Sequence, residues 1–200
     1  MSTERLVYTR RMAYDSAATR TRLLDAAYAE FSARGFAGTR VDRIAAEAGA
    51  NKQAIYLYFA SKEGLFDAVL ENRLGILADQ VPYTPGDLAA YIGALFDHMV
   101  NHPELVRLTQ WKYLERPDAT ELEVQSHVSK ATELAENLGV DRATGMDVLM
   151  LTLAMAQAWN TTSESVRLMG ETSEMRLEQH RTALIAAVAA VSGSATRTTS

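Results

Sequence analysis

The sequence of 200 residues contains no cysteine, only four prolines and no apolar run long enough to cross a bilayer. The lack of cysteine excludes disulfide bonds and thiolate metal sites, and it fits a protein of the reducing cytosol. The stretch from Met1 to Tyr14 has no apolar centre of the kind found in a signal peptide, so we expect a cytoplasmic protein without a membrane partner. Apolar residues still make up 48% of the chain, which is enough for a packed core.

Sequence signatures of catalysis are also missing. There is no Gly-rich phosphate loop and no HExxH pattern, and the acidic residues are scattered along the chain. His98 and His102 are four residues apart, a spacing that can place two imidazoles on one helix face. However, Pro103 disfavours helical geometry at His102, so we expect these histidines to cap a helix or line a pocket, with a metal site as the alternative. The sequence therefore predicts no catalytic residues, no metal and no cofactor.

The net charge of −5 would by itself argue against a nucleic-acid partner, but it is unevenly distributed. Residues 1–70 hold ten Lys or Arg and eight Asp or Glu, a net charge of +2. Residues 71–200 hold ten and seventeen, a net charge of −7. An acidic body repels DNA everywhere except at a positively charged binding head.

The stretch from Thr39 to Lys62 predicts two short helices separated by a tight break. Thr39 stands at the expected N-cap of the first helix, with Asp42 three residues later as a variant of the capping box. Gly49 can adopt the left-handed conformation that ends this helix. The second helix is predicted from Asn51 to Phe59, and two short helices joined by a glycine turn form a helix-turn-helix.

The polar residues of the second helix suit contacts with DNA. Lys52 can neutralise a phosphate or donate to guanine, while Asn51 and Gln53 each offer the donor and acceptor that match adenine in the major groove. Tyr56 and Tyr58 offer phenolic donors to phosphates. On spacing alone, an ordinary helical hairpin with a polar face is the alternative.

The segment AAEAGANKQAIYLYFASKEGLF resembles the DNA-binding signature of the TetR/AcrR family of bacterial transcriptional regulators. The matching pieces are AxxAG, Tyr-x-Tyr-Phe and Ser-Lys-Glu-x-Leu-Phe, in the family's order and spacing, and the resemblance covers residues 16–70. Asn51 stands where the family often has Ser, and Tyr58 where it often has His, so the half-site sequence does not carry over. The resemblance also implies that Lys62, in the first turn of the next helix, contacts a phosphate. The predicted DNA contacts are Thr39, Arg40, Asn51, Lys52, Gln53, Tyr56, Tyr58 and Lys62.

The periodicity along the chain predicts an all-α protein of about nine helices, with no strand pattern and no internal repeat. The helices are expected at residues 16–34, 39–48, 51–59, 62–79, 87–101, 104–115, 118–138, 141–161 and 173–191. The predicted domains are a flexible basic arm (1–15), a helix-turn-helix domain (16–62), a connecting helix (63–82), a ligand-binding and dimerisation domain (83–192) and a disordered tail (193–200). The arm can lie in a minor groove or be a solvated tail.

Aromatic and methionine side chains are frequent in the later helices, and such side chains suit adaptable apolar pockets. Regulators of the family that this chain resembles bind small effectors among helices 4 to 8. We therefore expect a small, largely apolar effector, with plain core packing as the alternative for each single residue. The predicted pocket residues are Tyr91, His98, Trp111, Met150 and Trp159.

The last predicted helix repeats apolar residues at near-heptad spacing, with small alanines beside them. The helix before it is apolar nearly all round, which indicates burial on more than one face. A homodimer would bury both helices and set two DNA-binding helices at roughly 34–36 Å, one turn of DNA. The predicted interface residues are Leu177, Leu184, Val188 and Val191.

These features together predict a homodimeric transcriptional regulator, most simply a repressor of a palindromic operator that a small molecule releases. The direction of control follows from the resemblance alone. A small-molecule enzyme on a helical scaffold and a helical interaction module without DNA are the alternatives. The operator sequence, the effector and the regulated genes do not follow from the sequence.

Overall fold

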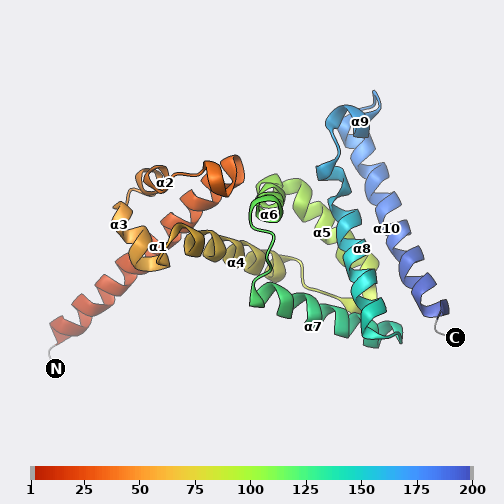
Figure 1. The fold of residues 1–200 in the computed structure, drawn as a ribbon, viewed down its shortest axis with the longest axis horizontal. Coiled ribbons are helices and arrows are strands. Elements are labelled where there is room, and N and C mark those ends of the chain that lie inside the picture. Colours follow the sequence, from red (N-terminus) through yellow and green to blue (C-terminus); the bar gives the residue numbers. More distant parts are fainter. Residues whose placement is uncertain (1–2, 199–200) are drawn as a thin grey trace. The chain divides into compact units, whose positions relative to one another are not determined.

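The structure, a computed structural model, describes residues 3–198, with side chains described from residue 16 to residue 195. Within this range all regular structure is helical, with ten α-helices and one 3-10 helix, so the all-α prediction is confirmed (Figure 1). The elements are α1 (Thr3–Gly38), α2 (Val41–Glu47), α3 (Lys52–Phe59), α4 (Lys62–Gln80), η1 (Pro85–Asp87), α5 (Leu88–Asn101), α6 (Pro103–Glu115), α7 (Glu121–Leu138), α8 (Arg142–Thr161), α9 (Glu164–Leu168) and α10 (Ser173–Thr198).

Capping residues set several helix ends where the sequence predicts them. At Gly35 the backbone leaves the helical conformation with φ of 69°, which a residue without Cβ adopts at little cost. The Ser61 hydroxyl accepts a hydrogen bond from the amide of Gly64 at 3.0 Å, at the start of α4. The Asp141 carboxylate accepts hydrogen bonds from two amides in the first turn of α8.

Other helix ends differ from the prediction. α1 begins at Thr3 and not at Ser16, because no Gly or Pro interrupts the first 34 residues. The predicted arm thus belongs to α1 from residue 3 onward, while residues 1 and 2 and the side chains up to residue 15 lie outside the described part. α10 continues to Thr198 through most of the predicted tail, whose last two residues are not described. The short helix α9 occupies part of a predicted loop.

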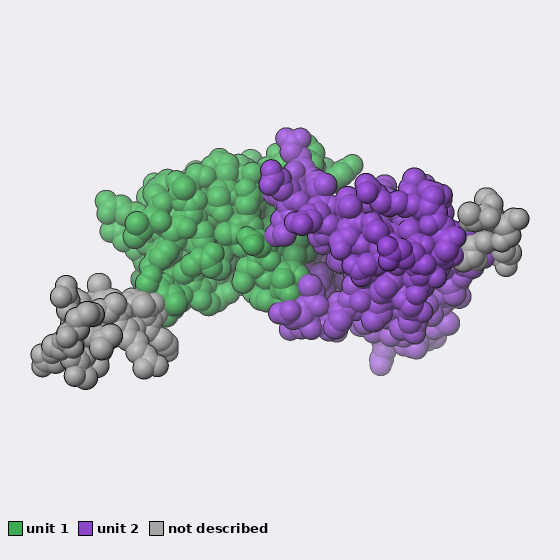
Figure 2. Space-filling model, turned by 90° about the horizontal axis from the view of Figure 1, so that it is seen from below, with its two compact units in different colours: residues 1–76, 107–117 green, residues 77–106, 118–200 purple. Residues whose placement is uncertain are grey.

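The chain divides into two compact units (Figure 2). Unit 1 comprises residues 1–76 and 107–117, and unit 2 comprises residues 77–106 and 118–200. The first division falls inside α4 and not in the Pro-rich linker at residues 81–86, and α6 is likewise divided. Two helices therefore contribute residues to both units.

Unit 1 is built around the apolar stripe of α1. Leu23, Ala27 and Phe31 of this stripe are fully buried, as the spacing predicts. The rings of Phe31 and Phe66 meet edge to face at 4.9 Å between centroids, which joins α1 to α4. Both helices of the motif, α2 and α3, pack on this core through buried side chains such as Ile44.

Unit 2 packs α5, α7, α8 and α10 around a second core. Gly145 allows α8 to approach α7 closely, since a Cβ built there would lie 2.6 Å from the carbonyl oxygen of Ala131. Arg181 of α10 donates to both carboxylate oxygens of Asp97 on α5, with a shortest distance of 2.8 Å. The longest helices of the unit are thus held by packing and by one bidentate ion pair.

Candidate nucleic-acid interface

The outward face of α3 is fixed by the burial of its opposite face. Ile55 is fully buried and Phe59 is 7% exposed, so these two side chains anchor α3 in the core of unit 1. Gln53 and Leu57 lie on the opposite side at i,i+4 spacing and are exposed. The face of α3 opposite the core thus carries one amide and one aliphatic side chain, with the exposed Lys52 and Tyr56 beside them.

Asn51 caps the N-terminus of α3. Its side-chain oxygen accepts a hydrogen bond from the amide of Gln53 at 2.9 Å. This bond engages the acceptor that a bidentate contact with adenine requires. Of the two residues predicted to match adenine, Gln53 is therefore the better placed.

An ion pair joins α3 to α2. The Lys52 ammonium lies 2.8 Å from the Asp42 carboxylate, and both side chains are exposed. The hydrogen bond to Asp42 raises the pKa of Lys52. Because water screens such a pair, it adds little to stability, and the lysine can exchange this partner for a phosphate.

Two tyrosines and a lysine surround the outward face. Tyr56 is 47% exposed. The Tyr58 hydroxyl lies within hydrogen-bond distance of the Ser16 hydroxyl, at 2.8 Å, which ties α3 to α1. Lys62 begins α4, and its ammonium lies 4.6 Å from the centroid of the Phe36 ring. Tyr58 packs against the core of unit 1 and Lys62 lies over an aromatic ring, so both can keep a polar head near the surface while the apolar part is covered.

The sequence predicts Thr39 as the N-cap of α2 and as a DNA contact, and the structure corrects both. Thr39 is only 3% exposed, and its hydroxyl donates to the carbonyl of Gly35 at 2.7 Å. The break at Gly35 brings that carbonyl within reach, so the threonine closes a buried turn. The N-cap is Arg40, whose backbone is extended and whose side chain makes no capping bond.

The C-terminal end of α6 contacts the segment before α2 within unit 1. The Glu115 carboxylate accepts hydrogen bonds from the amides of Phe36 and Ala37, at 2.5 and 3.1 Å. Arg116 lies 5.0 Å from the Phe36 ring and donates to Asp67 at 3.3 Å. Sequence patterns miss this contact because its partners lie almost 80 residues apart.

Trp111 packs against the turn at Gly35 and belongs to unit 1. A Cβ built on Gly35 would lie 2.8 Å from the Trp111 ring. Trp111 thus belongs to unit 1, whereas the other predicted pocket residues belong to unit 2, and its role in a pocket stays a prediction. Its indole serves the packing of the helix-turn-helix unit.

The other predicted pocket residues lie in unit 2 and differ in their exposure. Tyr91 and Trp159 are core side chains, 7% and 4% exposed, as the plain-core alternative expects. Met150 is 56% exposed on the outer side of α8. His98 is half-buried near the end of α5, where its ring lies 4.3 Å from that of His102.

The two histidines lie at the C-terminal end of α5. His102 is the C-cap residue of α5, and its amide donates to the carbonyl of His98. Burial and the neighbouring His102 lower the pKa of His98. Among the side chains that the structure describes, no three His, Cys, Asp or Glu residues gather to hold a metal ion.

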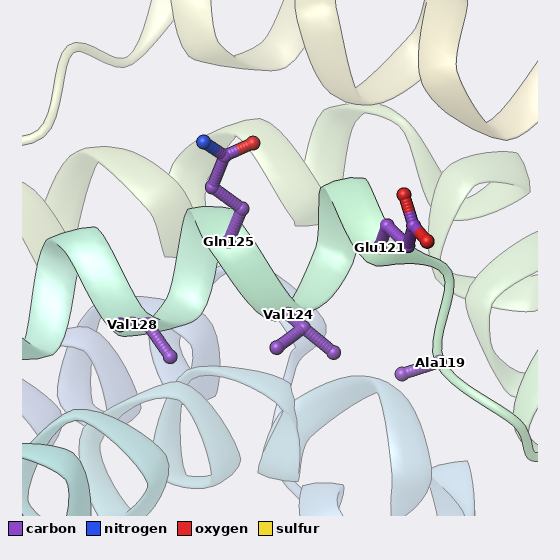
Figure 3. A pocket seen from close by; sticks show the side chains of 5 residues that line it. All are labelled: Ala119, Glu121, Val124, Gln125 and Val128. Atoms are coloured by element: carbon purple, nitrogen blue, oxygen red, sulfur yellow. The ribbon is translucent and has the colours of Figure 1, made fainter.

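An open surface hollow of about 430 Å³ lies along the first turns of α7 (Figure 3). Val124 is seven residues before the fully buried Ala131, so it lies on the same face of α7, yet it is 51% exposed. Val124 and Val128 point to the same side of the helix in Figure 3. Sequence patterns do not single out these residues because they resemble ordinary core positions. The hollow is lined by Ala119, Glu121, Val124, Gln125 and Val128.

The four predicted dimer residues pack against the core of their own unit, and a contact of the partly buried Leu177 and Val191 with a second copy stays a prediction. Leu184 and Val188 are 5% and 0% exposed, and they hold α10 against the rest of unit 2. The physical reason is that a heptad-like stripe suits a neighbour in the same chain as well as one in a second chain. The other two residues pack partly buried against the same core, and they are Leu177 and Val191.

A short α2, a glycine turn, the exposed face of α3 and a long α4 invite comparison with known regulators. Residues 23–69 match the family described as "Bacterial regulatory proteins, tetR family", and residues 87–189 match "Tetracyclin repressor-like, C-terminal domain". The chain belongs to the TetR family of transcriptional regulators. This family is not enzymatic, so the helical-enzyme alternative is wrong for this TetR-family protein.

Individual relatives agree with this assignment. The chain is 43% identical over 152 residues to the HTH-type transcriptional repressor SCO4008 of Streptomyces coelicolor, covering 72% of this chain and 79% of the relative. It is 36% identical over 97 residues to the HTH-type transcriptional repressor NicS of Pseudomonas putida, covering 45% and 46%. The crystal structure of the regulator SCO4942 of Streptomyces coelicolor matches with a TM-score of 0.69 at 35% identity, covering 85% of this chain and 96% of that one. No helix among the described residues of this TetR-family chain has the length and apolarity to span a bilayer.

Proposed function

We propose that this TetR-family regulator is a cytoplasmic repressor that binds a palindromic operator as a homodimer and is released by a small, largely apolar effector. The observation that carries the proposal is the face of α3, which is anchored by Ile55 and exposes Gln53 beside Lys52 and Tyr56. The name of the relative SCO4008, a transcriptional repressor, supports the direction of control.

In this proposal residues 16–62 form the DNA-binding domain, 63–82 the connecting helix, and 83–192 the ligand-binding and dimerisation domain. α3 enters the major groove and Gln53 contacts base edges. The other contacts go to phosphates and position the domain without carrying sequence information. They come from Arg40, Asn51, Lys52, Tyr56, Tyr58 and Lys62.

The proposed dimer uses the outer sides of α8 and α10, since the inner stripe of α10 is occupied. Met150 and Leu151 are each 56% exposed on α8, an apolar surface that a second copy could cover. On α10 the exposed Ala183 and Ala190 are small enough for a helix of the partner to approach closely. A two-fold axis through this surface would place two α3 helices on successive turns of DNA.

The proposed effector site is the hollow on α7, where Val124 and Val128 extend the core-facing stripe but are exposed and only partly buried, respectively. An apolar ligand would cover them. α6 starts in unit 2 and its Glu115 holds the amides of Phe36 and Ala37 in unit 1. An effector that displaces α6 would loosen these bonds and reduce operator affinity.

The test begins with selection of preferred duplexes from a randomised library by the full chain. Fluorescence anisotropy should then give a Kd at least about 10³-fold below that for unrelated DNA at physiological salt. Tyr56→Phe should weaken binding if its hydroxyl donates to a phosphate, whereas Tyr113→Phe, on the exposed face of α6, should not. Failure to enrich any sequence would refute the proposal.

A second arm tests the effector and the dimer. Light scattering should give twice the chain mass at micromolar concentration. Compounds that raise the melting temperature are then added to the protein–DNA complex. Each true effector must weaken DNA binding by the same factor by which DNA weakens effector binding. If Val124→Ser and Val128→Ser leave the ligand affinity unchanged, the effector binds elsewhere.

A further inference from the structure

Leu57 is exposed to a degree that the fold does not explain. Its side chain is 79% exposed, more than any other large apolar side chain among residues 16–195. It contributes nothing to the core of unit 1, which Ile55 and Phe59 anchor from the same helix. A polar helix-forming residue would serve folding and solubility equally well at this position.

The place of Leu57 on α3 links it to Gln53. The two residues are four apart and share the outward face, at a separation of about 6 Å along the helix axis. This length equals about two base-pair steps of DNA, each about 3.4 Å. Asn51 uses its oxygen as the helix cap, and Gln53 and Leu57 lie opposite the buried Ile55 and Phe59, so base contacts fall mainly to these two exposed side chains.

The chemistry of the two side chains selects A·T pairs. Glutamine can bond both the N6 donor and the N7 acceptor of adenine. Leucine can neither donate nor accept, and the C5 methyl of thymine is the apolar feature at the major-groove edge. We propose that Leu57 selects thymine through this methyl group, within about two base pairs of an adenine contacted by Gln53. This inference rests on the proposed operator binding and assigns to it a base preference.

Deoxyuridine provides the test because it pairs like thymine and lacks only the methyl group. Each thymine of the selected duplex is replaced in turn, and binding of the full chain is measured by anisotropy. At one thymine per half-site the replacement should weaken wild-type binding about fourfold, the effect of losing one buried carbon group. Leu57→Ala should weaken binding to the thymine duplex similarly and should bind the thymine and deoxyuridine duplexes equally.

Two variants control the experiment. Leu114→Ala removes another exposed leucine of unit 1, 69% exposed on α6, and should keep the full preference for thymine. Leu57→Met keeps an apolar side chain of similar reach and should retain the preference. Circular dichroism spectra should match for all variants, because neither position belongs to a core.

The outcomes separate this inference from the proposed function. If the Leu57→Ala protein still prefers thymine over deoxyuridine by the wild-type factor, Leu57 does not have the proposed role. The same conclusion follows if no deoxyuridine replacement changes binding of the wild-type protein. Both results leave operator binding intact, and the first would point to another use of the leucine, such as a protein contact. If no duplex is enriched at all, operator binding and this inference both fail.

Discussion

The helix α3 in unit 1 and the helices α8 and α10 in unit 2 use apolar residues under different constraints. α3 has eight residues and one neighbouring core, so burial of Ile55 and Phe59 decides where every other side chain points. α8 and α10 have 20 and 26 residues and pack on several partners. An apolar residue there can serve a core, a pocket or an interface equally well. The role of an apolar residue is therefore determined by local sequence in α3, but only by tertiary structure in α8 and α10.

The largest expected effect is the difference between charges placed on the inner side and on the outer side of α10. Leu184→Glu with Val188→Glu places two charges in the core of unit 2, at a cost of several kcal/mol each, enough to unfold a domain of ordinary stability. Ala183→Glu with Ala190→Glu should leave the protein folded but monomeric. Circular dichroism and light scattering distinguish the two results. A folded monomer from the first pair would show that the inner stripe is the dimer interface after all.

Glycine replacements should have opposite signs in two helices of unit 1. Gly35→Ala forces a Cβ onto a residue with φ of 69° and against the Trp111 ring, and it should cost about 1–3 kcal/mol. Gly75→Ala, in α4 with no atom near the added Cβ, should stabilise by about 0.5–1 kcal/mol. Urea unfolding measures both changes. Equal midpoints for the two variants would mean that the turn at Gly35 is not as tight as the structure has it.

The lysines should differ in their response to salt. Lys62→Ala removes a proposed phosphate contact, so it should weaken binding to all sequences and reduce the slope of log K against log salt by about one. Lys130 also lies above an aromatic ring, at 5.9 Å from Tyr83, but in unit 2. Lys130→Ala should leave the slope unchanged. If the plots of log K against log salt have the same slope for both variants and the wild type, Lys62 does not contact a phosphate.

The smallest expected effect is a pH dependence confined to unit 2, which contains all four histidines. Burial, together with His102 for His98 and Arg176 for His180, lowers the pKa of both His98 and His180 in the fold. The unfolded chain therefore binds more protons below a pH of about 6.5, and stability should fall as the pH decreases through that value. Thermal unfolding at pH 7.5 and 5.5 should show a decrease that His180→Gln reduces. An equal decrease in the variant would exclude His180 as a cause.

Local patterns predict much of the fold and part of the interface. The helix-turn-helix, the glycine break at Gly35, the Ser61 cap and the buried stripe of α1 all depend on residues within one or two helical turns of each other. The exposure of Gln53 and Tyr56 follows from the same short-range periodicity. Such features are accessible because the helical repeat fixes which side chains share a face.

What the sequence could not predict depends on distant residues. Thr39 is buried because the break at Gly35 presents a carbonyl to its hydroxyl, and Trp111 belongs to unit 1 because α6 returns to that turn. Leu184 and Val188 fit a core and an interface equally, and only the position of α5 and α8 decides between them. Val124 matches the core-facing stripe of α7, and no local pattern indicates that this end of the stripe is exposed.

Gln53→Ala tests the central claim, that α3 contacts bases, most directly. The matched control is Gln80→Ala, an exposed glutamine at the C-terminal end of α4 in the other unit. The measurement is the ratio of affinities for the selected duplex and for unrelated DNA at physiological salt. We predict that Gln53→Ala lowers this ratio by about 5- to 150-fold, equivalent to about 1–3 kcal/mol, while binding to unrelated DNA and the control variant stay unchanged. An unchanged ratio for Gln53→Ala would contradict the account.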